Sequence, residues 1–273
     1  MSDAAAAVGT PDKAQALTAA RDTGAVEAVF ANFRQYLLGW DDEGREVTSG
    51  VDHFRSGVGT PQFNGVVRVR SLSAVGQAVA TVRRNMAGLP WWWWVGPDSP
   101  EGTADALPRY GGHEFAALPV MVRSLDHTDD PTEAPAGLRI ETVQDGVRLA
   151  EVVATYRTSM GIARGLETEM VRIESTRRDN ADIVRLAAVL DGRVVGSTVV
   201  IAAHGIAGIF LVHVADACRR LGVGGALTAA ALRVGREHGM RSAALVASPA
   251  GEPLYRRFGF TTVSEYRLFT FPA

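Results

Sequence analysis

The residues with the clearest potential for chemistry are those of the run RRLGVGG at 219–225. Arg219 and Arg220 are followed by Gly222, Gly224 and Gly225. Glycine has no Cβ, so a backbone rich in glycine turns tightly and comes close to a ligand. The free N–H groups of a helix's first turn, with the helix dipole behind them, favour an anion, and arginines add charged donors. The run therefore predicts a phosphate-binding loop, and a pyrophosphate fits it best.

Two elements must hold this loop in place. The apolar residues at 206–214 predict a strand before it, and the residues after Gly222 predict a helix. Gly239 stands just beyond that helix, where a C-terminal cap belongs. The apolar face of the predicted helix consists of Val223, Leu227, Ala230, Ala231 and Val234.

Two common phosphate motifs do not fit the run. No Gly-Lys-Ser/Thr follows, as a Walker loop requires, and the third glycine of a dinucleotide G-x-G-x-x-G would fall at Leu227. Two other interpretations stay open: a different phosphate ligand such as a nucleotide, or a glycine-rich turn with two solvated arginines.

The pattern Arg219-x-x-Gly222-x-Gly224 resembles the R/Q-x-x-G-x-G/A coenzyme A loop of the GNAT superfamily of N-acetyltransferases. A second motif follows about 30 residues later. It consists of the small polar Ser248 after a short apolar run, and then the L-Y-x-x-x-G-F pattern of residues 254–260. The resemblance covers roughly residues 138–271, and the combined motifs are similar to a group common in actinomycete-type sequences.

The resemblance implies an acyl-CoA N-acyltransferase fold, an α/β (α+β) mixed sheet, with acetyl-CoA as cosubstrate. The strand before the loop would diverge from the next strand and admit the pantetheine arm. By position, that arm would be lined by Val212, His213 and Val214. The pyrophosphate would be held by Arg219, Arg220, Leu221, Gly222, Val223, Gly224 and Gly225.

The chemistry implied is attack of an amine on the thioester carbonyl. A backbone N–H on the diverging strand would stabilise the carbonyl oxygen, with Val214 as first candidate and Val212 next. Tyr255 stands where many superfamily members have the tyrosine that protonates the leaving thiolate; the alternative is that it only packs on the sulfur end of the cofactor. Ser248 stands where many members have Asn, and would contact the pantetheine, order a water or simply cap the strand end.

The group that accepts the amine's proton is not identified by the sequence. His213 lies on the appropriate strand and has an ordinary pKa near neutral, but strand alternation can point it away from the acyl group. The carboxylates of Glu114, Glu167, Glu169 and Glu174 are indistinguishable candidates. A chain of water molecules would leave no trace in the sequence.

Two positions depart from the family pattern. Asp216 replaces a common Pro, and Leu221 replaces a small or basic residue beside the expected pyrophosphate. These departures keep a second interpretation open, in which the chain binds acyl-CoA without useful transferase activity and has a regulatory or interaction role.

Composition bounds the remaining possibilities. The 273 residues carry 28 basic and 30 acidic side chains, a formal net charge of −2 that gives no general attraction to nucleic acid or to an anionic membrane. A single cysteine, Cys218, excludes an internal disulfide and a cysteine-rich metal site. The first residues lack a basic region followed by an apolar core. We therefore expect a cytoplasmic protein that uses no metal, nucleic acid or membrane.

The domain organisation predicted is a disordered segment at 1–12, an α/β domain at 13–125, a linker at 126–137 and the GNAT domain at 138–273. The linker has two prolines, four acidic residues and no apolar period. His127 among these acids could suggest a metal ligand, but a solvated acidic segment is the simpler interpretation. The first domain contains neither motif. By resemblance to the region that precedes the GNAT domain in some actinomycete-type chains, it would be a degenerate half of the same fold.

Four consecutive tryptophans, residues 91–94, stand out in the first domain. In a strand their rings would alternate between the two faces. Core packing, a substrate contact and a homodimer contact are the alternatives. The other elements expected there are helices at 13–38, 73–86 and 103–110 and strands at 63–70 and 115–123. In the second domain we expect a strand at 138–141, helices at 144–156 and 166–176, and a hairpin of 183–190 with 193–202 across Asp191-Gly192.

Overall fold

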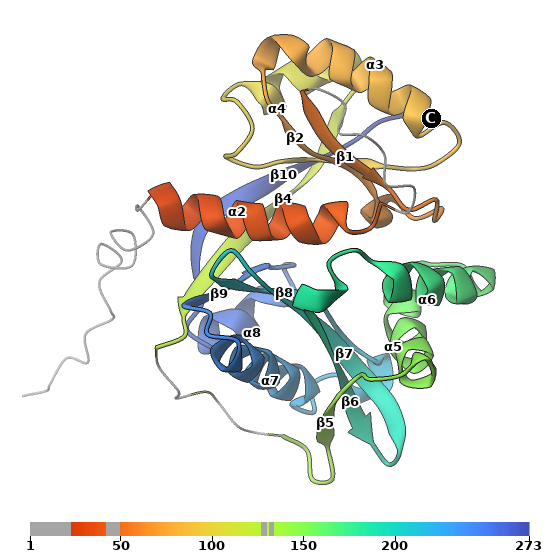
Figure 1. Ribbon diagram of the computed structural model, residues 1–273, viewed down its shortest axis with the longest axis vertical. Helices are drawn as coiled ribbons and strands as arrows, with labels where there is room; N and C mark the ends of the chain where they lie inside the picture. The colour runs from red at the N-terminus through yellow and green to blue at the C-terminus, as the bar shows by residue number, and fades with distance from the viewer. Residues whose placement is uncertain (1–22, 42–49, 127–129, 131–133, 273) are drawn as a thin grey trace, which may run out of the picture.

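One mixed sheet of ten strands runs through the computed structural model, which describes residues 23–41, 50–126, 130 and 134–272 (Figure 1). The first half contributes α2 (Thr23–Leu38), β1 (Val51–Arg55), β2 (Asn64–Val69), α3 (Val75–Asn85), β3 (Trp92–Val95), α4 (Thr103–Ala106) and β4 (His113–Ser124). The second half contributes β5 (Arg139–Thr142), α5 (Gly146–Ser159), α6 (Glu167–Thr176), β6 (Ile183–Leu190), β7 (Arg193–Ala203), β8 (Ile206–Val214), α7 (Val223–Glu237), β9 (Ser242–Val246), α8 (Glu252–Arg257) and β10 (Thr261–Thr270).

The two halves share this sheet by exchanging strands. The strand order is β1-β2-β3-β10-β4-β9-β8-β7-β6-β5. β10 pairs antiparallel with β3 on one side and β4 on the other, and β4 also pairs antiparallel with β9. The last strand of each half therefore pairs with strands of the other half. In Figure 1, β10 in blue runs to the upper part of the molecule.

The same succession of elements occurs twice. β1-β2-α3-β3-α4-β4 in the first half matches β7-β8-α7-β9-α8-β10 in the second. In both halves the second and third of these strands are parallel, and both parallel pairings are short. This repetition supports the hypothesis that the first half is a degenerate copy of the same fold.

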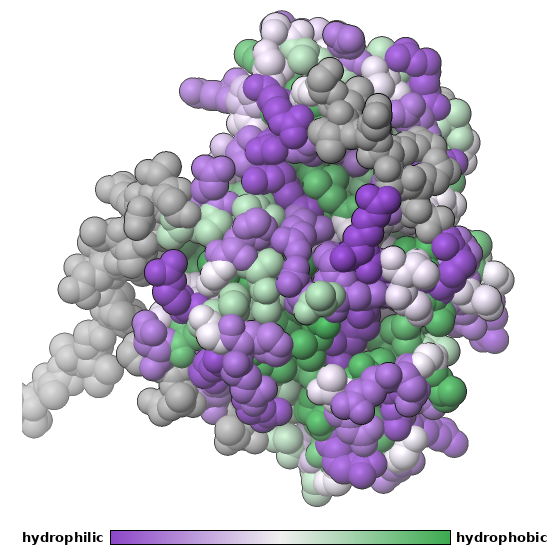
Figure 2. All heavy atoms as spheres, viewed as in Figure 1, coloured by the Kyte–Doolittle hydropathy of each residue, from purple (hydrophilic) through white to green (hydrophobic). Residues whose placement is uncertain are grey.

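The helices cover two opposite faces of the second half's strands. On β6, Ala188 belongs to a core formed with α7 and α8, whereas its neighbours Ala187 and Val189 belong to a core formed with α2, α5 and α6. This alternation follows from the two-residue period of a strand, because both faces are buried. On the face of the molecule seen in Figure 2, hydrophilic residues cover most of the surface and hydrophobic ones show between them.

Helix α2, from the first half, is fixed to the hairpin that β7 and β8 form. The Asn32 side chain donates hydrogen bonds to the carbonyls of Ile201, Ala203 and Ile206 at 3.0–3.1 Å. It reaches them because residue 208 is glycine: a Cβ there would lie 2.0 Å from the Asn32 Oδ1. Helix α2 therefore packs against the beginning of β8, the strand predicted to line the cofactor.

A buried ion pair after α6 also contacts helix α2. Arg177, after α6, donates to the Asp179 carboxylate at 2.8–2.9 Å and to the Tyr36 carbonyl at 2.7 Å. Its guanidinium lies over the rings of Tyr36 and Trp40, 4.6 and 4.9 Å from their centroids. Because both charges are buried and paired, losing one partner would leave the other charge uncompensated.

Most predicted elements are present, with two differences. Strand β1 was not predicted, because its buried Asp52 interrupts the apolar pattern; Asp52 is paired with Arg68 at 2.7 Å and Arg70 at 2.5 Å. The linker is not fully solvated, because Asp130 is only 9% exposed and bridges Arg123 and Arg236. The predicted disorder at 1–12, the helix residues before 23, most of the polar loop after Asp41, and His127 lie outside the described residues.

The last three tryptophans of the run lie in β3, and Trp91 directly precedes it. Trp91 and Trp93 are buried beneath α3, where Trp91 stacks on Phe271 at 4.4 Å between ring centroids. Trp92 and Trp94 face the core under α2. Core packing therefore accounts for Trp91 and Trp93, whereas Trp92 and Trp94 are half-buried. No helix among the described residues has the length and apolarity needed to cross a membrane.

Candidate active site

Strands β8 and β9 diverge where the pantetheine arm was predicted. They pair in parallel only over residues 206–208 and 242–244. The register of β8 against β7 shifts near Thr198, and Leu211 has a positive φ of 50° in that stretch. This bulge bends β8 and leaves its edge facing β9 without a strand partner from Ile209 onward. That edge offers backbone groups to another extended molecule.

The loop after β8 ends in an uncapped helix N-terminus. Arg220 and Gly222 both have left-handed backbone, with φ of 62° and 87°. Gly222 is the N-cap of α7 and makes no side-chain cap hydrogen bond. Within the described residues, the N–H groups of residues 222–225 donate no hydrogen bond. Successive free N–H groups beside left-handed residues form an anion-binding concavity, strengthened by the helix dipole.

The glycines at the start of α7 are not required by packing inside the protein. A Cβ at Gly224 would lie 3.4 Å from Leu254 and 3.8 Å from Val214, which is ordinary contact. A Cβ at Gly225 would come no closer than 3.8 Å to Phe258. A ligand can therefore come close to the backbone at these glycines.

The charged and apolar side chains of the loop lie at the surface. Arg219 pairs with Asp216 at 2.7 Å, and both are more than half exposed. Arg220 makes no ion pair with a described residue and is exposed. Leu221 is 53% exposed, so its side chain is not part of the core.

Tyr255 lies on α8, in the core formed with α7. Its side chain is 8% exposed and packs edge-to-face on Phe260. Burial raises the pKa of the Tyr255 hydroxyl to about 12, so it stays protonated at neutral pH. Its hydroxyl bonds to no other described residue. The phenol therefore keeps its proton available for a ligand.

Ser248 lies in the turn between β9 and α8. Its Oγ accepts a hydrogen bond from the Gly251 N–H at 3.2 Å, and the residue is exposed. This hydrogen bond is compatible with the strand-end cap, one of the three roles predicted for Ser248. A Cβ at Gly251 would lie 3.0 Å from the Tyr255 ring and 3.3 Å from Ser248 Oγ, so the two candidate residues flank the same glycine.

The last residues of β8 divide between the two faces. Val212 and Val214 pack toward the core under α7. His213 lies on the other face, with its ring 6.0 Å from that of Tyr156 on α5. Burial, with a smaller effect from Arg219, lowers the pKa of His213 from 6.5 to about 4. The imidazole is therefore neutral at pH 7 and would hold an accepted proton poorly.

The four candidate carboxylates are distinguished by the structure. Three lie at the surface beside arginines: Glu114 with Arg267, Glu167 with Arg157 and Glu169 with Arg172. Glu174 is 2% exposed, accepts a hydrogen bond from the Tyr156 hydroxyl at 3.1 Å and pairs with Arg185 at 2.7 Å. Glu174 is therefore linked through Tyr156 to the face of β8 on which His213 lies, but its charge is already compensated by Arg185.

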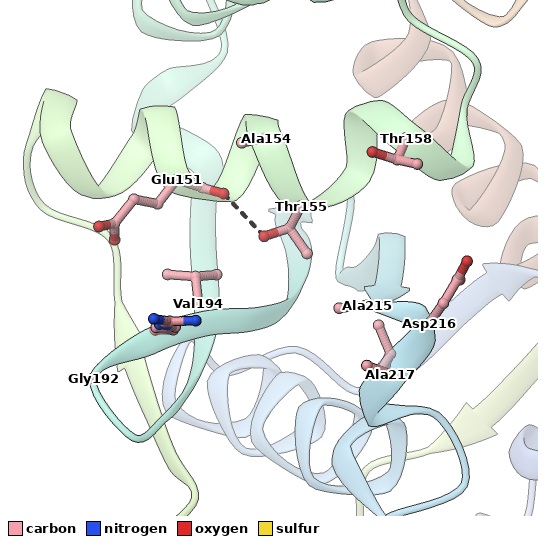
Figure 3. Close-up of a pocket in the computed structure, with 11 residues that line it drawn as sticks. Glu151, Ala154, Thr155, Thr158, Gly192, Val194, Ala215, Asp216 and Ala217 are labelled. Atoms are coloured by element: carbon pink, nitrogen blue, oxygen red, sulfur yellow. Dashed lines mark hydrogen bonds between the residues drawn. The ribbon is translucent and has the colours of Figure 1, made fainter.

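A cavity of about 600 Å³ adjoins the loop on the α5 face, and we name it the α5 cavity (Figure 3). In Figure 3, α5 forms one wall, and the turn before β7 and the segment after β8 lie opposite it. Its lining consists of Glu151, Ala154, Thr155, Thr158, Gly192, Arg193, Val194, Val214, Ala215, Asp216 and Ala217. Among the described residues, no three His, Cys, Asp or Glu side chains are grouped to hold a metal ion.

The equivalent place in the first half is closed. Five residues separate β2 from α3, against eight between β8 and α7. Gly76 is the second residue of α3, as Gly224 is of α7, but a Cβ at Gly76 would lie 2.7–2.9 Å from the Tyr110 ring. The aromatic ring of Tyr110 therefore covers the helix start that is open in the second half.

Comparison with known proteins identifies the family of the segment that contains these residues. Residues 150–260 match the Acetyltransferase (GNAT) family. This segment contains β8, the loop, α7 and the motif with Tyr255, and the recognition of the GNAT superfamily is thereby confirmed for residues 150–260. No curated protein sequence matches the chain.

Solved structures share the fold over nearly the whole chain. A GCN5-related N-acetyltransferase from Kribbella flavida is 20% identical with a TM-score of 0.67, over 90% of this chain and 96% of its own. One from Sphaerobacter thermophilus is 17% identical with a TM-score of 0.61, over 94% of each chain. A tandem GNAT protein from the clavulanic acid biosynthesis pathway is 17% identical with a TM-score of 0.58, over 92% of this chain and 95% of its own. At these identities the likeness establishes the fold.

Proposed function

We propose that this protein transfers the acetyl group of acetyl-CoA to a primary amine of a small molecule or peptide, by direct attack in a ternary complex. The observation that carries the proposal is the open start of α7, where the N–H groups of residues 222–225 have no partner among the described residues. The match of residues 150–260 to the GNAT family supports acetyl transfer.

The residues present fit the proposed cosubstrate. The N–H groups of the loop would hold the pyrophosphate, with Arg219 and Arg220 adding charge. The free edge of β8 at residues 212–214 would pair with the pantetheine arm. Acetyl-CoA supplies the thioester. The N–H of Val214, with that of Val212 as second candidate, would stabilise negative charge on its carbonyl oxygen.

Tyr255 is proposed to hold the proton that the leaving thiolate needs. Its raised pKa, caused by burial, keeps it protonated at working pH. The acceptor of the amine's proton is less well defined. His213 would be a weak base there because of its lowered pKa, which favours proton loss to solvent. We propose that Ser248 acts by fixing the start of α8, and therefore the position of Tyr255.

We propose a single active centre per chain, in the second half. The first half lacks the longer loop, and Tyr110 covers the start of α3. A tyrosine equivalent to Tyr255 is also missing, because four residues before Gly111, the residue matching Gly259, the chain has Leu107. Both glycines have a positive φ, of 82° and 78°, and follow corresponding short helices.

Calorimetric titration with acetyl-CoA tests the proposal. We expect micromolar binding with one molecule per chain, with free coenzyme A as a control and ATP as a competitor. Release of free thiol with a panel of amines then tests transfer. Displacement by ATP rather than coenzyme A would assign the loop to a nucleotide. Binding without thiol release for any amine would favour a coenzyme-binding protein without transferase activity.

A further inference from the structure

The turn that follows β9 occurs a second time, in the first half of the chain. The sequence SPAG at 248–251 lies between β9 and α8, and SPEG at 99–102 lies between β3 and α4. Each serine stands four residues before the first residue of its short helix. β3 and β9 occupy corresponding places in the two halves, so the first half keeps this turn although Tyr110 covers the start of α3.

A cavity of about 490 Å³ lies beside the SPEG turn, and we name it the α4 cavity. Residues within 95–105, from the end of β3 through the turn into α4, form one wall, and residues within 264–267 of β10 form another. No lining residue is shared with the α5 cavity. A cavity of this size accommodates a molecule of several carbon atoms, so the first half offers a second place at which a small molecule can be bound.

Ser99 lines the α4 cavity, and its hydroxyl has no hydrogen-bond partner among the described residues. The residue is only 8% exposed. Its counterpart Ser248 accepts a hydrogen bond from the Gly251 N–H at 3.2 Å. The turn in the first half is folded differently, since Gly102 has a φ of 82° and Gly251 a φ of −87°. Buried hydroxyls are normally hydrogen-bonded, so the Ser99 Oγ is available to a ligand in the cavity.

A second unpartnered oxygen lies next to this serine. The Asp98 side chain is 9% exposed, and its Oδ2 accepts a hydrogen bond from Arg34 while its Oδ1 has no partner among the described residues. A Cβ at Gly96, which lines the cavity, would lie 2.9 Å from that Oδ1. Burial raises the pKa of Asp98 above its ordinary value, against the opposing effect of Arg34. A cation bound nearby would therefore stabilise the charged form of this carboxylate.

The charge at the α4 cavity favours a cation. The lining carboxylates of Glu101 and Glu265 are exposed and make no ion pair with a described residue. Glu265 and Arg267 are two residues apart on β10 and so share a face of the sheet. Arg267 does not compensate Glu265, because it pairs with Glu114 at 2.6 Å and with Asp105 at 3.5 Å. The cavity therefore carries an excess of negative charge, which attracts cations.

We propose that the α4 cavity binds a small organic compound that carries primary ammonium groups. An ammonium group has three N–H donors, which suits a site made of one neutral oxygen, on Ser99, and the carboxylates of Glu101 and Glu265. The site lies apart from the active centre proposed above, and the inference does not depend on acetyl transfer. It gives the first half, whose cofactor loop is closed, a binding role of its own.

Calorimetry on the full chain without acetyl-CoA tests this site, with 1,4-diaminobutane as the probe and 1,4-butanediol as its uncharged analogue. The diamine should bind, the diol should not, and added salt should weaken the binding. Ser99→Ala should weaken diamine binding roughly tenfold, the effect of one hydrogen bond to a charged group. The same variant should unfold at the wild-type temperature or above it, because the deleted hydroxyl has no partner in the protein.

Two carboxylate variants form a matched pair for the charge. Glu265→Gln should weaken diamine binding roughly two- to fivefold, as expected for an exposed ion pair. Glu237→Gln removes an exposed carboxylate on α7, in the other half of the chain, and should change nothing. All three variants should bind acetyl-CoA as the wild-type protein does, because none of the three residues belongs to the proposed cofactor site.

The outcomes separate this inference from the proposed function. If the diamine bound no more tightly than the diol, the assignment of the α4 cavity would be wrong. Diamine binding that persists unchanged in Ser99→Ala and Glu265→Gln would overturn it as well and would place the diamine elsewhere, such as in the active centre. A lower unfolding temperature of Ser99→Ala with unchanged affinity would make Ser99 a structural residue. Failure of the wild-type protein to bind acetyl-CoA would refute the proposed function alone.

Discussion

A negative charge at Gly224 should weaken acetyl-CoA binding by about two orders of magnitude while leaving the fold intact. A Cβ at this position meets Leu254 at 3.4 Å and Val214 at 3.8 Å, so the substitution Gly224→Glu does not force the helix apart. A carboxylate in the first turn of a helix is favoured by the dipole by about 0.3–1 kcal/mol. The unliganded variant should therefore unfold at a temperature equal to or above that of the wild-type protein.

The loss of binding follows from charge. A carboxylate about 5 Å from a phosphate, at an effective dielectric constant near 20, is repelled by about 3 kcal/mol. This energy corresponds to a roughly 100- to 300-fold weaker Kd. Calorimetry gives the affinity, and thermal unfolding with and without acetyl-CoA gives both the intrinsic stability and the stabilisation by the ligand.

Two matched variants separate charge from size. Gly224→Gln has the shape of glutamate without its charge and should lose only part of the affinity, and Gly224→Ala should bind nearly as the wild-type protein does. If Gly224→Glu bound acetyl-CoA normally, the pyrophosphate would lie elsewhere. If Gly224→Ala also failed to bind, the contact with Leu254, and not electrostatics, would explain the loss.

Three further predictions follow from the buried groups. Tyr255→Phe should keep acetyl-CoA affinity and lower kcat by roughly 100-fold; unchanged turnover would restrict Tyr255 to packing. Arg177→Ala should lower the free energy of unfolding by about 3–5 kcal/mol in urea titrations, because Asp179 stays buried without its partner, and a loss below 1 kcal/mol would contradict this account. Because burial and Arg219 lower the pKa of His213 from 6.5 to about 4, the unfolded chain takes up a proton in this window that the folded protein does not, so His213 should make the protein about 2 kcal/mol less stable at pH 5 than at pH 7. The variant His213→Gln should lose that difference, and an unchanged difference between the two pH values would show that other groups cause it.

The anion loop was predictable from the sequence because its chemistry is local. Glycine spacing, a preceding apolar run and a following amphipathic helix are all contained in residues 206–239. The same holds for the hairpin across Asp191-Gly192, whose positive φ values of 49° and 76° are those expected of its turn. Such features depend on neighbours in the chain, which the sequence displays directly.

Features that depend on distant partners were not predictable. Nothing in the pattern of residues 261–270 shows that this strand pairs with β3 and β4 of the first half, because a strand's apolar alternation does not encode its partner. The fate of Arg177 was equally hidden, since its stacking on Tyr36 and Trp40 joins residues about 140 positions apart. The covering of Gly76 by Tyr110 likewise appears only in three dimensions.

The position of β10 has a consequence for how the protein is made. β10 follows every other described element in the chain, yet it occupies the middle of the sheet, between β3 and β4. During synthesis, β3 and β4 therefore lack the strand that pairs with both of them until the ribosome has released residue 270. The first half cannot complete its sheet as an early folding unit, and nascent chains would expose two unpaired strand edges until translation is nearly over. A gene fragment that ends before β10 would keep these edges permanently open.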